Sequence, residues 1–208
     1  MRDPLPALAT ELSEGAAGSQ RRVIIGILGA PGTGKSTVAQ RLQGLVGEDI
    51  CVVVPMDGFH LSQDVIRGTD LETRKGAADT FDVGGYINLL ERLKRNREDV
   101  IYAPDYRRSV EDPIAAAIAI PKSVRVVLTE GNYLLADTGR WGEVRQFLDE
   151  TWFVDTPHDV RVARLIQRHT AFGKAPDVAA QWAKGSDEQN ALLVEATRSR
   201  ADRIIVWQ

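Results

Sequence analysis

A glycine-rich loop with the composition of a phosphate-binding site follows the first apolar run of the chain. Residues 29–36 read GAPGTGKS and fit the pattern GxxxxGK[ST]. Glycines in this pattern let successive backbone amides turn inward onto a polyphosphate at a helix N-terminus, where the helix dipole also favours negative charge. The lysine then reaches the β and γ phosphates, and the hydroxyl ligates Mg²⁺. The pattern predicts a nucleoside triphosphate site, with ATP as the default, made of Gly29, Ala30, Pro31, Gly32, Thr33, Gly34, Lys35, Ser36 and Thr37.

Two carboxylates stand at the ends of apolar runs. Asp57 comes directly after the run 51–56, and Glu130 closes the run 124–130. Strand C-terminal ends in an α/β sheet open into the ligand crevice, so Asp57 would face the glycine loop if the two strands are neighbours. It could then accept a proton from a substrate hydroxyl or hold the metal, whereas its local sequence by itself favours an ordinary Asp-Gly turn. A buried strand-end acid is costly unless paired, so Glu130 is predicted to meet the ion near Ser36.

Three arginines share one face of the predicted helix 159–169. Arg161, Arg164 and Arg168 are three and four residues apart, which places them on the same side of a helix. Basic stripes of this kind are usually solvated. In a phosphoryl-transfer enzyme the same stripe can clamp the charge of the transferred group as a lid closes, and Gly173 would provide a hinge.

The elements that must position these groups alternate along the chain. Continuous apolar runs predict strands covered on both faces, as in a parallel sheet, at 22–29, 51–56, 124–130, 151–155 and 203–208. Helical spacing predicts helices at 36–46, 85–96, 140–150, 159–169, 178–185 and 187–201. This alternation predicts an open α/β sheet with right-handed crossovers.

Two segments stand apart from the alternation. Residues 58–80 are polar and weakly periodic, which is unusual in a compact domain unless the segment is functional. They include His60, a residue type that taken alone is more often packed or on the surface than functional. At the other end of the chain, Leu5, Leu8 and Leu12 predict a short helix within 1–20, although this stretch could equally be a loose arm.

Composition limits the classes of function. The 208 residues fit one domain, 1–208, and the net charge of -3 gives no overall attraction for nucleic acid or an anionic membrane. Cys51 is the single cysteine and lies in an apolar run, which predicts an inert thiol, no intrachain disulfide and a reducing, cytoplasmic location. The N-terminus lacks the order of a signal peptide, and no apolar run approaches the length of a membrane span. A homodimer is left open, because the sequence does not determine an oligomeric state.

Taken in order, the motifs resemble those of a known group of kinases. The chain reads GAPGTGKST, MDGFH, RKGAADTFDVGGY, APDYRRSVEDP, TEGNYLL and VDTPHDVRVARLIQRH, all within residues 22–206. This combination resembles the P-loop kinase group of uridine kinase, pantothenate kinase and phosphoribulokinase, most of all the bacterial branch labelled nucleoside/nucleotide kinase or fructose transport system kinase. The resemblance implies a three-layer P-loop NTPase fold: a mostly parallel five-stranded sheet, helices on both faces and a lid segment.

The resemblance also implies roles for the phosphate-handling residues. Asp57 occupies the position of the group's catalytic aspartate, and Glu130 that of its strand-end acid near Mg²⁺. The three arginines of 159–169 match the arginine-bearing lid helix. This implies catalytic roles for Lys35, Arg161 and Arg164 and ATP contacts for Arg164 and Arg168.

Acceptor contacts are implied less directly. Segments that line the acceptor site in relatives contain, in this chain, His60, Arg74, Asp82, Tyr106, Asn132 and Tyr133. Arg74 could instead lie in a surface turn, Asp82 could cap a helix, and Asn132 with Tyr133 could simply close a strand turn. Arg107 stands where related sequences often carry an aspartate, so acceptor contacts there depart from the group's pattern.

These observations predict an ATP- and Mg²⁺-dependent kinase that phosphorylates a hydroxyl of a small metabolite. The branch label favours a fructose-like sugar, with nucleosides and pantothenate-like alcohols as alternatives. A GTPase-type switch is disfavoured because the guanine signature Asn-Lys-x-Asp is absent from the sequence. A non-catalytic ATP-binding regulatory subunit of a sugar transport system is the alternative from another class.

Overall fold

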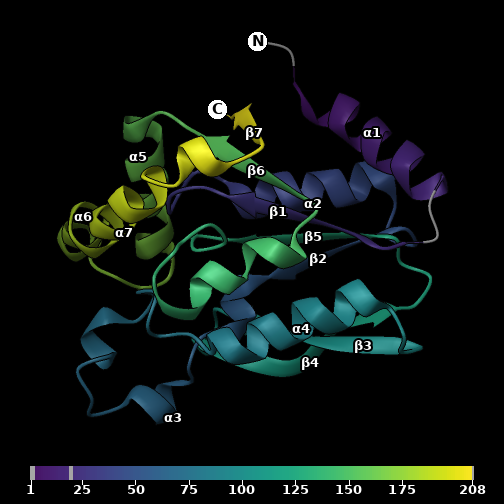
Figure 1. Cartoon of the computed structure of the whole chain (residues 1–208). Coiled ribbons are helices and arrows are strands. Elements are labelled where there is room, and N and C mark those ends of the chain that lie inside the picture. Colours follow the sequence, from purple (N-terminus) through teal and green to yellow (C-terminus); the bar gives the residue numbers. More distant parts are fainter. Residues whose placement is uncertain (1–2, 19–20, 208) are drawn as a thin grey trace.

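The central sheet is parallel and has five strands in the order β2-β5-β1-β6-β7. The computed structural model describes residues 3–18 and 21–207 (Figure 1). The strands are β1 (Val23–Leu28), β2 (Cys51–Pro55), β5 (Val126–Gly131), β6 (Glu150–Asp155) and β7 (Arg203–Val206). All five predicted runs are therefore confirmed as strands, although Gln208 of the last run lies outside the described residues.

Helices cover both faces of this sheet, as predicted. On one face, Ile25 and Ile27 pack with α1 (Leu5–Ala17) and α2 (Lys35–Val46). On the other face, Ile24 and Leu28 pack with α4 (Val83–Arg95). Successive strand residues point to opposite faces, so a continuous apolar run feeds two cores at once.

The predicted N-terminal helix is confirmed. Leu5, Leu8 and Leu12 of α1 are buried against α2, so the helix is a packed part of the fold rather than a loose arm. Residues 1, 2, 19 and 20 of the predicted arm lie outside the described residues.

Three helices after β6 gather at one end of the molecule (Figure 1). They are α5 (His158–Ala171), α6 (Pro176–Lys184) and α7 (Ser186–Glu195). The predicted helices 159–169 and 178–185 are confirmed. The last helix ends at Glu195, and Arg198–Arg200 form a 3-10 turn, so the prediction of one helix over 187–201 was too long.

The predicted helix at 140–150 is wrong. The segment forms two 3-10 turns, Gly139–Glu143 and Arg145–Phe147, and its last residue starts β6. Trp141, Val144 and Leu148 are buried, which reproduces the apolar spacing of a helix without its hydrogen-bonding pattern. A residue spacing of three is shared by α and 3-10 helices, so the apolar pattern did not separate them.

A β-hairpin that the sequence did not predict lies beside α4 (Figure 1). Strands β3 (Val100–Arg107) and β4 (Asp112–Pro121) pair antiparallel, with an irregularity between Ala103 and Asp105. Ile101 and Ala103 are buried, whereas β4 is alanine-rich and half of its residues are exposed. Alanine has low β propensity, and the proline that directly follows Ala103 interrupts the alternation.

Candidate active site

The glycine loop joins β1 to α2 at the C-terminal edge of the sheet. Gly34 caps α2 with a left-handed φ of 92°, which delivers Lys35 as the first residue of the helix. Gly32 has a φ of 84°, and a Cβ there would stand 2.7 Å from the carbonyl oxygen of Arg161. The loop therefore needs glycine at both positions for backbone shape and for close approach of α5.

Lys35 is held inside this loop. Its ammonium donates to the carbonyl oxygen of Ala30 at 3.2 Å, and the residue is 8% exposed. Burial lowers the pKa of Lys35 to about 8, against the opposing pull of Glu130 and Asp57. A buried cation without a full complement of anions is suited to receive the phosphates of a nucleotide.

The sheet order brings the two predicted carboxylates together. Strand β5 lies between β1 and β2, and Glu130 pairs in register with Ile27 on one side and Pro55 on the other. The Ser36 hydroxyl donates to Glu130 Oε1 at 2.9 Å. Burial raises the pKa of Glu130, and the nearby Asp57 raises it further, since two carboxylates share the same edge of the sheet.

This donor set fits Mg²⁺. Ser36 and Glu130 present hydroxyl and carboxylate oxygens side by side next to the phosphate loop. Within the described part of the chain, no group of three or more His, Cys, Asp or Glu side chains could hold a metal. Magnesium at phosphate sites typically takes one or two protein oxygens and completes its shell with phosphate and water. A cation here would also offset the electrostatic strain between Glu130 and Asp57.

A chamber of about 260 Å³ opens in front of these groups. Its floor contains Lys35, Ser36, Asp57 and Glu130, one wall comes from residues 60–111, and the other comes from residues 168–190. The chamber also contains five more of the predicted acceptor and ATP contacts, namely Pro31, His60, Tyr106, Asn132 and Arg168.

Aromatic rings shape the wall beside Asp57. His60 lies between Phe81 and Tyr106, with ring centroids 4.0 Å and 4.8 Å away and the ring planes tilted. The His60 Nδ1 lies 2.8 Å from the carbonyl oxygen of Asp57, and burial lowers the pKa of this imidazole. Burial raises the pKa of Tyr106 to about 12, so both rings are uncharged at neutral pH. The predicted histidine therefore lies in the chamber, next to Asp57.

The three arginines of the α5 stripe lie in different surroundings. Arg161 is buried and donates to the Pro31 carbonyl oxygen and to the carboxylate of Glu188 on α7. Arg164 donates to the Thr33 carbonyl oxygen at 3.4 Å. Only the third arginine of the stripe, Arg168, lines the chamber. Arg161 thus ties α5 to the loop and to α7, and its predicted catalytic role has no support from its position.

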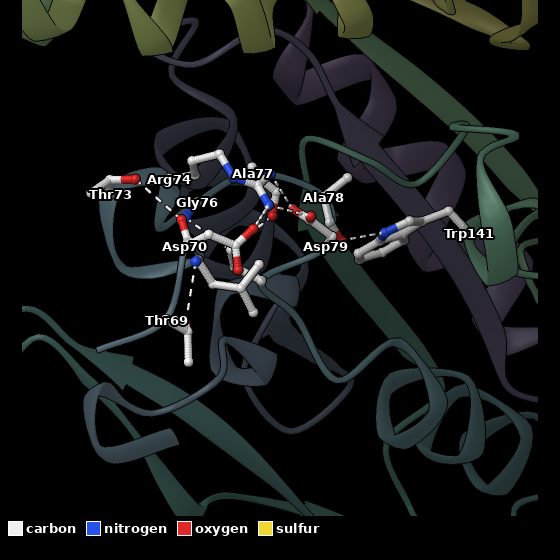
Figure 2. Close-up of polar contacts among 11 residues, drawn as sticks. Thr69, Asp70, Thr73, Arg74, Gly76, Ala77, Ala78, Asp79 and Trp141 are labelled. Atoms are coloured by element: carbon white, nitrogen blue, oxygen red, sulfur yellow. Dashed lines mark hydrogen bonds and ion pairs between the residues drawn. The ribbon is translucent and has the colours of Figure 1, made fainter. Parts of the chain in front are cut away.

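Arg74 and Asp82 do not reach the chamber. Arg74 forms ion pairs with Asp79 at 2.8 Å and Asp70 at 3.4 Å, as Figure 2 shows. Asp82 accepts from the Gly85 amide at 2.8 Å and caps α4. Both residues fulfil the structural alternatives, a surface turn and a helix cap, and the structure places neither next to Asp57.

Contacts with the rest of the chain hold residues 58–80, the segment that the sequence predicted to be functional. Between the 3-10 turn Met56–Phe59 and α4 the chain forms α3 (Gln63–Ile66) and a second 3-10 turn, Glu72–Arg74. Tyr133, buried and outside the chamber lining, donates to the Gly76 carbonyl oxygen at 2.8 Å. The Trp141 indole donates to the Ala78 carbonyl oxygen at 2.9 Å (Figure 2). Together these bonds hold Lys75 and Gly76 in the chamber wall.

Sequence reasoning missed several chamber residues. Lys75 donates to the Glu111 carbonyl oxygen at 2.6 Å, and Arg108 at the hairpin tip lies 3.8 Å from Asp57. The far wall adds the pair His169 and Asp187, 2.6 Å apart, together with Phe172, Lys174 and Trp182. The adjacent arginines in APDYRRSVEDP were the available signal, but without the hairpin nothing assigned Arg108 to the chamber.

Fold and site together define a P-loop kinase. Residues 24–206 match the Phosphoribulokinase / Uridine kinase family, and the chain belongs to it. Members of this family transfer phosphate to a hydroxyl, so the chain is a small-molecule kinase, and the family implies ATP use. Among residues 3–18 and 21–207, no helix has both the length and the apolar character needed to cross a membrane.

Relatives extend over nearly the whole chain. A Schizosaccharomyces pombe protein whose name proposes uridine kinase activity is 30% identical, covering 89% of this chain and 83% of its own. Escherichia coli YggC is 33% identical, covering 89% and 78%. The crystal structure of a Silicibacter sp. TM1040 protein, named as a candidate fructose transport system kinase, is 34% identical, with a TM-score of 0.86 and coverage of 97% and 98%.

Proposed function

We propose that this chain transfers the γ-phosphoryl group of Mg²⁺-ATP to a hydroxyl of a fructose-like sugar. The observation that carries the proposal is the convergence of Lys35, Asp57 and Glu130 on one chamber beside the glycine loop. A nucleotide-binding module without transfer chemistry has no need of a carboxylate across from the phosphate loop. The sugar is favoured because the Silicibacter relative, which matches almost end to end, is named for fructose transport.

Each floor residue has a role that its environment supports. Lys35 and the loop amides hold the β and γ phosphates, and the cost of burying the lysine cation is recovered when phosphate oxygens surround it. Ser36 and Glu130 would hold Mg²⁺, which supplies neutralisation of the phosphate charge. Arg168 contacts the phosphates from the α5 wall, and Arg164 lies nearer the loop.

Asp57 is assigned to the acceptor hydroxyl. It follows β2 at the open edge of the sheet and is a third exposed, so a substrate can reach its carboxylate. As the acceptor oxygen forms its bond to the γ-phosphorus, the bond from that phosphorus to the β–γ bridging oxygen breaks. The acceptor proton passes to Asp57, which orients the hydroxyl beforehand.

A nucleoside is the second candidate acceptor. Phe81 and Tyr106 flank His60 on the acceptor side, and rings of this kind can pack against a sugar face or a base. The Schizosaccharomyces pombe relative is named for uridine kinase activity. A pantothenate-like alcohol is the third acceptor to be compared.

The test measures ADP release from Mg²⁺-ATP with fructose and other sugars, uridine and cytidine, and pantothenate. Asp57→Asn should bind ATP as the wild type does and lose about 10²- to 10⁴-fold in turnover, the typical contribution of a positioned base. Asp64→Asn removes the same charge from an exposed side chain of α3 and should leave turnover unchanged.

Each outcome of this test leads to a different conclusion about the proposed transfer. Turnover that depends on one class of acceptor and disappears in Asp57→Asn supports the proposal and names the acceptor. Weakened ATP binding with normal turnover in Asp57→Asn would remove Asp57 from the acceptor site. ATP binding without turnover on any acceptor would contradict the proposed transfer and favour the regulatory alternative.

A further inference from the structure

Arg108 stands at the tip of the β3–β4 hairpin and reaches across the chamber mouth. Its guanidinium lies 3.8 Å from the Asp57 carboxylate. On the opposite side the guanidinium carbon lies 5.9 Å from the Phe172 ring centroid, just beyond the end of α5. Arg108 therefore contacts both walls of the chamber and the residue assigned to the acceptor hydroxyl.

The contact with Asp57 is loose. A separation of 3.8 Å exceeds hydrogen-bond length, and both side chains remain in contact with solvent, Arg108 at 44% and Asp57 at 33% exposure. Ion pairs of this kind contribute little to stability because water and salt screen them. Arg108 can thus leave Asp57 at small cost once a stronger anion enters the chamber.

A second guanidinium faces Arg108 from α5. Arg168 lines the same chamber, and within residues 3–18 and 21–207 its side chain has no hydrogen bond or ion pair. Burial lowers the pKa of Arg168 and the positive charge of Arg108 lowers it further, whereas the negative charges of Asp187, Asp57 and Glu130 oppose this shift. Two arginines that repel each other across a cavity are stabilised when an anion lies between them.

We propose that Arg108 is a catalytic arginine that moves from Asp57 to the transferring phosphoryl group and clamps it opposite Arg168. This inference rests on the proposed function, since it needs the γ-phosphoryl group to lie next to Asp57. The planar guanidinium can bond two phosphoryl oxygens at once, which matches the charge that spreads over those oxygens during transfer.

The movement has a consequence for the acceptor. In the ligand-free chain the positive charge of Arg108 lies next to Asp57, the group that must take the acceptor proton. When Arg108 pairs with the phosphoryl oxygens, Asp57 is released to accept that proton as the new oxygen–phosphorus bond forms and the bond to the leaving ADP oxygen breaks. Asp57 therefore becomes available as a base only once the nucleotide is bound.

The experiment compares Arg108→Gln, Arg108→Lys and the matched control Arg107→Gln. Arg107 is the adjacent exposed arginine, carries the same charge and does not line the chamber. With the acceptor identified by the panel above, Arg108→Gln should lower kcat by about 10²- to 10³-fold and change KM for ATP less than about threefold, because the contact forms only during transfer. Arg108→Lys should recover part of the loss, and Arg107→Gln should match the wild type.

A double-mutant comparison separates a clamp from a residue that merely orients Asp57. In single-turnover assays of the residual activity, Arg108→Gln should still lower the rate at least tenfold when Asp57 is already Asn, since the phosphoryl contact does not depend on the carboxylate. No further loss in that background would overturn the inference and leave Arg108 as a support for Asp57.

Failure of the inference and failure of the proposed function give different results. Wild-type turnover with an unchanged kcat in Arg108→Gln overturns the clamp alone. Absence of wild-type turnover with every acceptor overturns the proposed function and the clamp with it. Far-ultraviolet circular dichroism and the thermal midpoint of each variant show whether it folds. If Arg108→Gln does not fold, Arg108→Lys, which retains the charge, is compared with the wild type instead.

Discussion

Lys35 keeps its charge inside the protein before any nucleotide binds. Its pKa falls from an ordinary value of 10.5 to about 8, mainly because the side chain is buried. At about 1.4 kcal/mol for each pH unit, protonated Lys35 costs the ligand-free fold about 3.5 kcal/mol relative to the unfolded chain. We therefore expect Lys35→Met, which keeps the length of the side chain but removes the charge, to stabilise the ligand-free protein.

The expected gain in stability of Lys35→Met is smaller than the electrostatic cost of burying the charge. Methionine cannot donate to the Ala30 carbonyl oxygen, and losing that hydrogen bond costs about 1 kcal/mol. The expected result is an increase of about 2.5 kcal/mol in the free energy of unfolding at pH 7. A pKa that is lower in the folded state makes the wild type gain stability as pH rises from about 8 to 10.5, so the advantage of Lys35→Met shrinks over that interval.

Urea unfolding at pH 7 and at pH 10, without nucleotide and with Mg²⁺-ATP, measures this effect. ATP should stabilise the wild type and not the variant, because the phosphates lose their buried cation. Lys122→Met, at an exposed lysine, should unfold like the wild type at both pH values. A Lys35→Met variant that is less stable than the wild type at pH 7 without nucleotide would refute the argument.

Three further predictions concern the glycine loop, helix α2 and the base of the sheet. Gly32→Ala places a Cβ 2.7 Å from the carbonyl oxygen of Arg161 at a φ of 84° and should weaken ATP binding at least tenfold by calorimetry, roughly 1.4 kcal/mol. Gly44→Ala, with open space around a helical glycine, should instead raise stability by about 0.5–1 kcal/mol. Arg22→Met leaves three backbone carbonyl oxygens without their buried donor and should lower the free energy of unfolding by about 2–4 kcal/mol. Urea unfolding measures this loss, and a loss below about 0.5 kcal/mol would contradict a stabilising role for these hydrogen bonds.

Local patterns determined the parts of the site that depend on neighbouring residues. The glycine loop needs particular backbone angles over a few consecutive positions, so its residue types alone specified the phosphate cradle around Lys35. The five buried strands were equally visible, because a strand covered on both faces must be apolar at every position. Asp57 and Glu130 followed from where those strands end.

Tertiary structure decided what the remaining charged side chains do. Arg161 and Arg168 share a helix face and residue type, yet Arg161 is tied to Glu188 of α7 and Arg168 lies in the chamber. Arg108 reaches Asp57 only because an alanine-rich hairpin pairs antiparallel and brings its tip over the sheet edge. Partners that lie far apart in the sequence leave no periodic pattern, so such contacts follow from packing alone.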